Sequence, residues 1–168
     1  YKACSLISRL VKEGYDVQTV CTNSALHFIG ISTLEGLTRR SVFHDMFEPR
    51  RNMEHITLSK WTDLAIICPA SANTINKIAN GIADNTVTTL FLSHSFYKPY
   101  MVVPAMNQEM YLNEATQASI ERLKTRNVIV VDTCVGHQAC GDVGPGRMPE
   151  PEAIYEEVVK LLSGKKNK

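Results

Sequence analysis

The stretch LAIICPASANTINKIAN, residues 64–80, joins a short apolar run to a segment with the composition of a helix. The run LAIIC has the length and the continuous hydrophobicity of a strand that is buried on both faces of a parallel sheet. Helical residues follow from position 72, and Ser71 or Asn73 is placed to cap the N-terminus of that helix. The stretch therefore predicts a strand, a turn and a helix of an α/β sheet.

The same alternation continues along the chain. Apolar runs predict further strands at 16–22, 100–103 and 128–131, and helical spacing predicts helices at 1–13, 86–92, 108–126 and 152–162. We expect an α/β fold with a Rossmann-like or flavodoxin-like parallel sheet, helices on both faces, and one domain over residues 1–168. Domains of this kind begin with a strand, whereas this chain opens in a helix. We therefore expect the first strand and its turn to precede residue 1.

Composition and charge argue against several classes of protein. With 18 Lys and Arg against 17 Asp and Glu, no strong field attracts the chain to nucleic acid or to an anionic membrane. No apolar run approaches the roughly 20 residues that span a bilayer. Five cysteines form no paired framework, which indicates a reducing, cytoplasmic setting in which a special cysteine acts as a thiol.

Two loops that follow predicted strands carry polar groups where a parallel sheet binds ligands, beyond the carboxyl ends of its strands. Residues 69–74 combine small side chains with Ser71, Asn73 and Thr74 at a helix N-terminus, which favours an anion or an electron-rich ring edge. In residues 104–111, PAMNQEMY, the NH2 group of Asn107 can hold a substrate carboxylate. Ordinary helix capping and turn stabilisation are the alternatives for these loops.

A third segment, residues 136–148, is rich in glycine, and we expect it to lack regular structure and to act as a flexible lid. Cys140 in such a lid can deliver a proton to a bound ligand. Cys134, His137 and Cys140 also have zinc-type spacing, but the sequence offers no obvious fourth ligand, so we expect no metal site. His55 is a candidate base near neutral pH, although a lone histidine is more often structural.

Three motifs together resemble those of the homo-oligomeric flavin-containing cysteine decarboxylases. Residues 69–85 resemble the family's flavin-binding stretch, 104–111 its Pro-x-Met-Asn-x-x-Met substrate motif, and 139–151 its substrate clamp. In that family, peptidyl-cysteine decarboxylases of lantibiotic synthesis lack the Ala-Cys-Gly clamp, whereas phosphopantothenoylcysteine decarboxylases carry it. Cys140 therefore makes the chain most similar to the second branch.

The resemblance implies a role for each matched residue. It implies His55 and Cys140 as catalytic residues, and Asn107, Met106, Ala139, Gly141 and Arg147 as substrate contacts. It implies that FMN is bound by Thr22, Ser24, Ser71, Ala72, Asn73, Thr74 and Ala105, while the family's phosphate-side loop falls before Tyr1. It further implies a homotrimer or dodecamer with the flavin between subunits, and a phosphopantothenate–cysteine ligase domain that is fused or separate.

The implied reaction is FMN-dependent decarboxylation of 4′-phospho-N-pantothenoylcysteine to 4′-phosphopantetheine in coenzyme A biosynthesis. The substrate amine is an amide and cannot form a Schiff base, so the electrons need another sink. Flavin oxidation of the CH2–S group gives a thioaldehyde whose C=S lies β to the carboxylate, CO2 leaves, and re-reduction with a proton from Cys140 gives the thiol. The alternatives are a lantibiotic-type peptidyl-cysteine decarboxylase and a non-catalytic, phosphatase-regulating relative.

Overall fold

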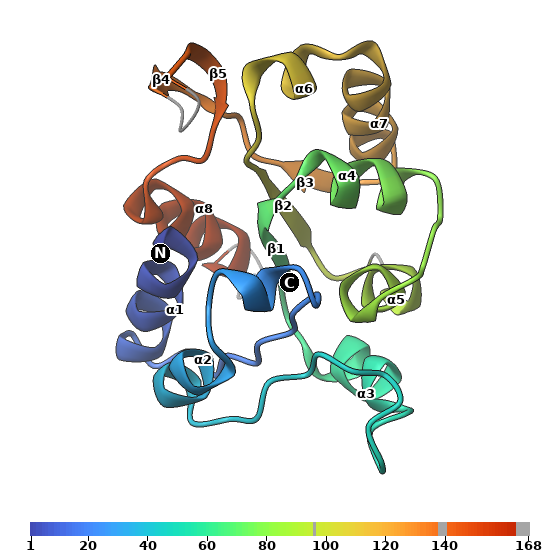
Figure 1. Cartoon of the computed structure of the whole chain (residues 1–168). Helices are drawn as coiled ribbons and strands as arrows, with labels where there is room; N and C mark the ends of the chain where they lie inside the picture. Colours follow the sequence, from blue (N-terminus) through green and yellow to red (C-terminus); the bar gives the residue numbers. More distant parts are fainter. Residues whose placement is uncertain (96, 138–140, 164–168) are drawn as a thin grey trace.

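A parallel three-stranded sheet forms the centre of the protein, and the computed structural model describes residues 1–95, 97–137 and 141–163. The strands β1 (Ala65–Ala70), β2 (Tyr100–Pro104) and β3 (Val128–Val130) lie in the order β1-β2-β3 (Figure 1). Val102 of β2 pairs with Ile67 of β1 and with Val130 of β3. The predicted α/β class is therefore confirmed.

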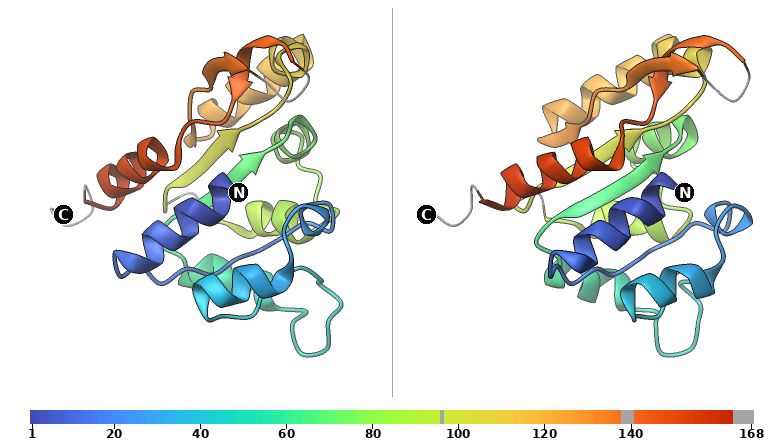
Figure 2. Two further views of the ribbon diagram at one scale, coloured as in Figure 1. Left: turned by 60° about the vertical axis from the view of Figure 1, so that its left-hand side comes forward. Right: turned by 90° about the vertical axis from the view of Figure 1, so that its left-hand side faces the viewer.

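Helices cover both faces of this sheet, as the sequence predicts. One face is covered by α4 (Ala72–Ala79), α5 (Thr86–Ser93) and α7 (Glu114–Thr125). The other is covered by α1 (Lys2–Lys12) and α8 (Pro151–Ser163), which lie side by side in Figure 2.

The residues of β2 show how one strand serves both layers. Tyr100 and Val102 pack into the core under α4, α5 and α7, whereas Met101 and Val103 pack under α1 and α8. All four side chains are buried. Successive side chains of a strand point to opposite faces, so a continuous apolar run is what a sheet covered on both sides requires.

Six smaller elements complete the described chain. These are the 3-10 turn η1 (Ala25–His27), the helices α2 (Ile31–Thr38), α3 (Glu54–Trp61) and α6 (Gln108–Leu112), and a hairpin of β4 (Cys134–His137) and β5 (Val143–Arg147). Among the described residues, no helix combines the length and the apolar character needed to cross a bilayer.

The strand predicted at 16–22 is wrong, because only one isolated bridge, between Val20 and Phe43, forms there. Cys21 N–H donates to the Phe43 carbonyl at 2.9 Å, and Phe43 N–H donates to the Thr19 carbonyl at 3.1 Å. Sequence hydrophobicity indicates an extended segment, but a strand needs a partner along its length. Here the pairing covers only this bridge.

The single helix predicted at 108–126 is also wrong, because Asn113 divides it into α6 and α7. Asn113 has an extended backbone, with φ −58° and ψ 132°, and its side chain accepts a hydrogen bond from Ala115 N–H. An asparagine that caps a new helix competes with continuation of the previous one.

The glycine-rich segment predicted to lack regular structure contains an antiparallel hairpin instead. Gly136 of β4 lies opposite Gly144 of β5, and His137 lies opposite Val143. Gly146 adopts φ +109°, a conformation that side-chain-bearing residues rarely adopt. The glycines thus permit a tightly bent pair of strands.

We expect Ile78→Ala to lower the free energy of unfolding by about 2–5 kcal/mol, because Ile78 of α4 is fully buried against the sheet and its loss leaves a cavity. Glu121→Ala on exposed α7 surface is the matched control, with a change within about 0.5 kcal/mol. Chemical denaturation of both variants measures the difference. Equal stability of the two would contradict the assigned core.

Candidate functional site

Three of the predicted site segments meet at the carboxyl ends of β1 and β2. Ala105 N–H, just after β2, donates to the carbonyl of Ala70, the last residue of β1, at 2.9 Å. Met106 N–H donates to the Gly146 carbonyl of the hairpin at 3.0 Å. Figure 1 shows the start of α4, α6 and the β4–β5 hairpin at this edge of the sheet. The structure therefore joins the segments that the sequence predicts as flavin loop, substrate loop and clamp.

The loop after β1 presents polar groups on a base of small residues. Ser71 caps α4, and its hydroxyl accepts from Thr74 N–H at 3.4 Å and lies 3.3 Å from the Thr74 hydroxyl. Ala70 and Ala72 are buried beneath, whereas Ser71 and Asn73 are exposed. A helix N-terminus of this kind favours an anion or the polar edge of a ring, and the small residues let a planar group approach the backbone.

Asn107 is the last residue of the loop after β2 and caps α6. Its Oδ1 accepts a hydrogen bond from Glu109 N–H at 2.8 Å. Because this bond directs Oδ1 toward α6, the NH2 group is the end of the amide that a carboxylate would meet. The turn-stabilising role and the binding role are therefore compatible in one side chain.

The hairpin carries the remaining predicted substrate contacts. Arg147 Nη2 donates to Glu150 Oε1 at 2.8 Å, and Lys2 Nζ donates to the same oxygen at 2.8 Å. The hydrogen bond from Lys2 lowers the pKa of the Glu150 carboxyl below its usual value, and the positive charge of Arg147 lowers it further. Gly141 is exposed with φ +95°, and Ala139 and Cys140 lie outside the described residues.

Thr22 and Ser24, the other predicted flavin contacts, follow the isolated bridge and precede η1. Ala25 N–H donates to Thr22 Oγ1 at 3.2 Å, and Ser24 is the residue before η1. The segment is fixed by Thr86, whose buried hydroxyl donates to the Cys21 carbonyl at 2.7 Å. The sequence did not single out Thr86. The feature of the local sequence that marks it is its position directly after Asn85, the N-cap of α5.

His55 does not join these loops within one chain. It lies on α3, which packs against α5, and its carbonyl accepts from the Ser93 hydroxyl at 3.2 Å. Because α3 leads into the amino end of β1, it lies at the opposite end of the sheet from α6 and the hairpin (Figure 1). The His55 Nδ1 atom is buried and has no hydrogen-bond partner within the part of the chain that the structure describes.

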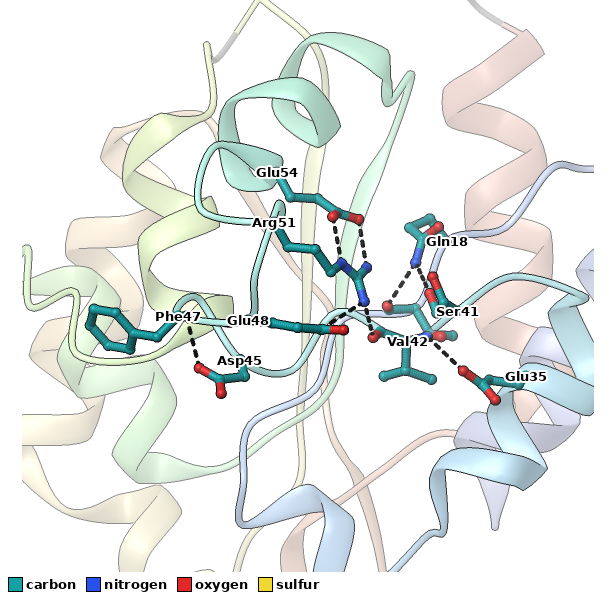
Figure 3. A network of polar contacts seen from close by, with 10 residues as sticks. Gln18, Glu35, Ser41, Val42, Asp45, Phe47, Glu48, Arg51 and Glu54 are labelled. Atoms are coloured by element: carbon teal, nitrogen blue, oxygen red, sulfur yellow. Dashed lines mark hydrogen bonds and ion pairs between the residues drawn. The ribbon is translucent and has the colours of Figure 1, made fainter.

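A network around Arg51 fixes the start of α3, and hence the backbone that carries His55 (Figure 3). Arg51 donates through Nε and Nη2 to the two carboxylate oxygens of Glu54, each at 2.6 Å, and through Nη1 to the Val42 carbonyl at 2.8 Å. Glu48 lies 3.2 Å from Nη1, and the guanidinium stands 5.2 Å from the centre of the Phe43 ring. The hydrogen bond with Glu54 is the largest cause that raises the pKa of Arg51.

Cysteines outside the clamp differ in their environments. Burial raises the pKa of the Cys68 thiol to about 12. The pKa of the Cys21 thiol is also raised, mainly by burial and to a smaller extent by the neighbouring Cys4. Cys134 is exposed. No group of three metal-ligating side chains occurs among residues 1–95, 97–137 and 141–163. The alternative zinc set includes Cys140, which lies outside the described residues, so the expectation of no metal site stays a prediction.

Comparisons with known proteins identify the class. The family described as Flavoprotein matches residues 1–163, so the chain belongs to the flavoprotein family. This match confirms the resemblance to flavin-containing proteins that the motifs indicate.

One similar relative is the coenzyme A biosynthesis bifunctional protein CoaBC of Vibrio cholerae serotype O1. It is 40% identical over 173 residues, which cover 99% of this chain and 43% of that protein. The chain thus spans less than half the length of the curated relatives it matches.

Two solved structures share the fold. A PPC decarboxylase mutant complexed with pantothenoylaminoethenethiol has a TM-score of 0.84 and 29% identity, covering 96% of this chain and 93% of that one. The FMN binding protein AtHal3 has a TM-score of 0.81 and 31% identity, covering 94% and 88%.

We expect iodoacetamide to alkylate Cys134 in the folded protein at pH 8, whereas Cys21 and Cys68 remain thiols. Alkylation needs an accessible thiolate, and a raised pKa keeps a thiol protonated until the pH approaches that value. Peptide mass mapping over time measures the rates, with the denatured chain as control. Labelling of Cys68 as fast as Cys134 in the folded protein would contradict this assignment.

Proposed function

We propose that this chain is an FMN-dependent decarboxylase that converts 4′-phospho-N-pantothenoylcysteine to 4′-phosphopantetheine in coenzyme A biosynthesis. One observation carries the proposal. The bonds from Ala105 N–H to Ala70 and from Met106 N–H to Gly146 bring the flavin, substrate and clamp segments to one edge of the sheet. The names of the similar proteins support the same reaction.

The residues at the start of α4 fit an FMN molecule. Ser71, Asn73 and Thr74 provide hydroxyl and amide groups for the edge of the ring, and the buried Ala72 leaves the backbone open to it. Ala105 adjoins them through the Ala70 carbonyl, and Thr22 and Ser24 provide further contacts. When bound, FMN supplies an acceptor for the hydride of the substrate CH2–S group and later returns it.

The side chains of the chain hold the substrate and move its protons. Asn107 binds the carboxylate through its NH2 group, while Oδ1 keeps the amide oriented by its bond to Glu109 N–H. Met106, Ala139, Gly141 and Arg147 line the substrate. His55 accepts the thiol proton at the start, and Cys140 donates a proton to carbon at the end.

The identity of the proton donor receives support from a relative. The PPC decarboxylase mutant has a serine in place of a cysteine, and its ligand is pantothenoylaminoethenethiol. An enethiol is the decarboxylated compound before its double bond is reduced. A reaction that stops there when a cysteine is lost is the behaviour we propose for Cys140. A lantibiotic-type peptidyl-cysteine decarboxylase would end at the enethiol without such a donor.

A second copy of the chain completes the site in this proposal. His55 lies at the other end of the sheet from Asn107, so one chain does not bring both side chains to one substrate. A homotrimer or a dodecamer with FMN between subunits would supply His55 from a neighbour. The similar relative is bifunctional, so we further propose that a phosphopantothenate–cysteine ligase acts with this chain, fused or separate.

We expect the protein loaded with FMN to be yellow and to release CO2 from 4′-phospho-N-pantothenoylcysteine, and Cys140→Ser to release CO2 but yield the enethiol. The serine hydroxyl is a far weaker acid than the thiol, so the last proton transfer fails. Product mass spectrometry distinguishes the two products, which differ by two hydrogens. Normal product at full rate from Cys140→Ser would remove it from the mechanism, and inertness of the parent would end the proposal.

We expect His55→Asn and Asn107→Asp each to lose activity and mixed oligomers of the two to regain it. Asn107→Asp keeps an oxygen for the Glu109 N–H cap and replaces the NH2 group by a charge that repels the carboxylate. Random mixing gives one intact site in about four when each site draws on two subunits. Mixtures that stay inactive after co-refolding would show that both side chains act within one chain.

A further inference from the structure

Ser93, the last residue of α5, contacts the backbone of His55 on the neighbouring helix α3 (Figure 1). Its hydroxyl donates to the His55 carbonyl at 3.2 Å and shares the same hydrogen with the Leu90 carbonyl of its own helix at 3.0 Å. In return, the buried Ser59 hydroxyl of α3 donates to the Ser93 carbonyl at 2.7 Å. Because a serine hydroxyl lies one bond beyond Cβ, these two contacts hold the backbones of the two helices at a fixed separation.

The position of the His55 imidazole depends on this backbone. The Nδ1 atom is buried and accepts or donates no hydrogen bond within the described part of the chain. Ser59 follows His55 by four residues, so both lie on the face of α3 that meets α5. The ring therefore takes its place from its own Cα atom and from packing, and a shift of α3 moves it directly.

The helix that carries Ser93 is itself anchored at its other end. The buried hydroxyl of Thr86, the first residue of α5, donates to the Cys21 carbonyl at 2.7 Å, and Asn85 closes the first turn in a capping box. The helix has eight residues, so its two ends lie roughly 10 Å apart. Ser93 is thus a fixed point of the fold from which the backbone of His55 is held.

We propose that Ser93 and Ser59 are positioning residues that place His55 for removal of the substrate thiol proton. This inference rests on the proposed function. In that step the thiol proton passes to His55 and a hydride from the adjacent carbon passes to the flavin, which leaves a C=S bond. Asn107 captures the carboxylate at the other end of the sheet and does not depend on the contact. A displaced imidazole therefore slows oxidation without weakening substrate binding.

Ser93→Ala tests the proposal in the FMN-loaded oligomer. Under anaerobic single turnover with saturating substrate, bleaching of the flavin slows roughly 10-fold, because a misplacement of about 1 Å can cost up to about 100-fold. The half-saturating substrate concentration and the affinity for FMN stay as in the parent. Thr125→Ala is the matched control and bleaches at the parent rate. Thr125 ends α7, is exposed, and donates to the Arg122 carbonyl of its own helix at 2.8 Å.

Three further variants separate positioning from a merely structural role. Ser93→Thr keeps the hydroxyl and recovers most of the bleaching rate. Ser59→Ala slows bleaching by less than Ser93→Ala does, and it serves as the test if Ser93→Ala does not fold. In a His55→Asn background, Ser93→Ala causes no additional slowing, because a residue that acts through His55 has no effect once His55 is lost.

Two results would overturn the inference. One is bleaching at the parent rate in folded Ser93→Ala and Ser59→Ala. The other is a Ser93→Ala defect of the same size in the His55→Asn background as in the parent. A parent protein that substrate does not bleach, or a His55→Asn variant that bleaches at the parent rate, would instead refute the proposed function or the role of His55 in it. The two kinds of failure are therefore distinguishable.

Discussion

The parallel pairing of β1 with β2 is the constraint on which the rest of the site depends. The ladder runs from Ala65 opposite Tyr100 to Ala70 opposite Pro104, and the bond from Ala105 N–H to the Ala70 carbonyl extends it by one residue into the loops. Because parallel strands end at the same edge, both loops leave the sheet together. The core above and below β2 is buried on both faces, so neither strand can shift without exposing apolar side chains.

The sheet could be predicted from sequence because its signal is local. The runs at 64–68, 100–103 and 128–131 are continuous and apolar, and these three became β1, β2 and β3. The segment 16–22 has the same character but lacks a partner along its length, and pairing is not encoded in one segment alone. Asn113 likewise acts through one side-chain bond that helical periodicity does not reveal.

The residues of the candidate site also fall into two groups, those that could be placed from the sequence and those that could not. Ser71 and Asn107 could be placed from sequence, because each follows a predictable strand and both cap the next helix. The position of His55 at the other end of the sheet could not, because it depends on how α3 packs against α5 and on the ion pairs of Arg51 with Glu54. Thr86 could not be recognised for a related reason, because its hydrogen-bond partner, Cys21, is distant in the sequence.

This arrangement separates the two halves of the proposed reaction physically. The residues proposed to bind the flavin and the carboxylate sit on loops at the edge of the sheet, and the hairpin of β4 and β5 is fixed to these loops by the bond from Met106 N–H to the Gly146 carbonyl. The two branches that the motifs resemble share the sheet-edge motifs and differ in the clamp. Our proposal, in which the sheet edge holds the flavin and the substrate carboxylate and the clamp supplies the last proton, accounts for that division.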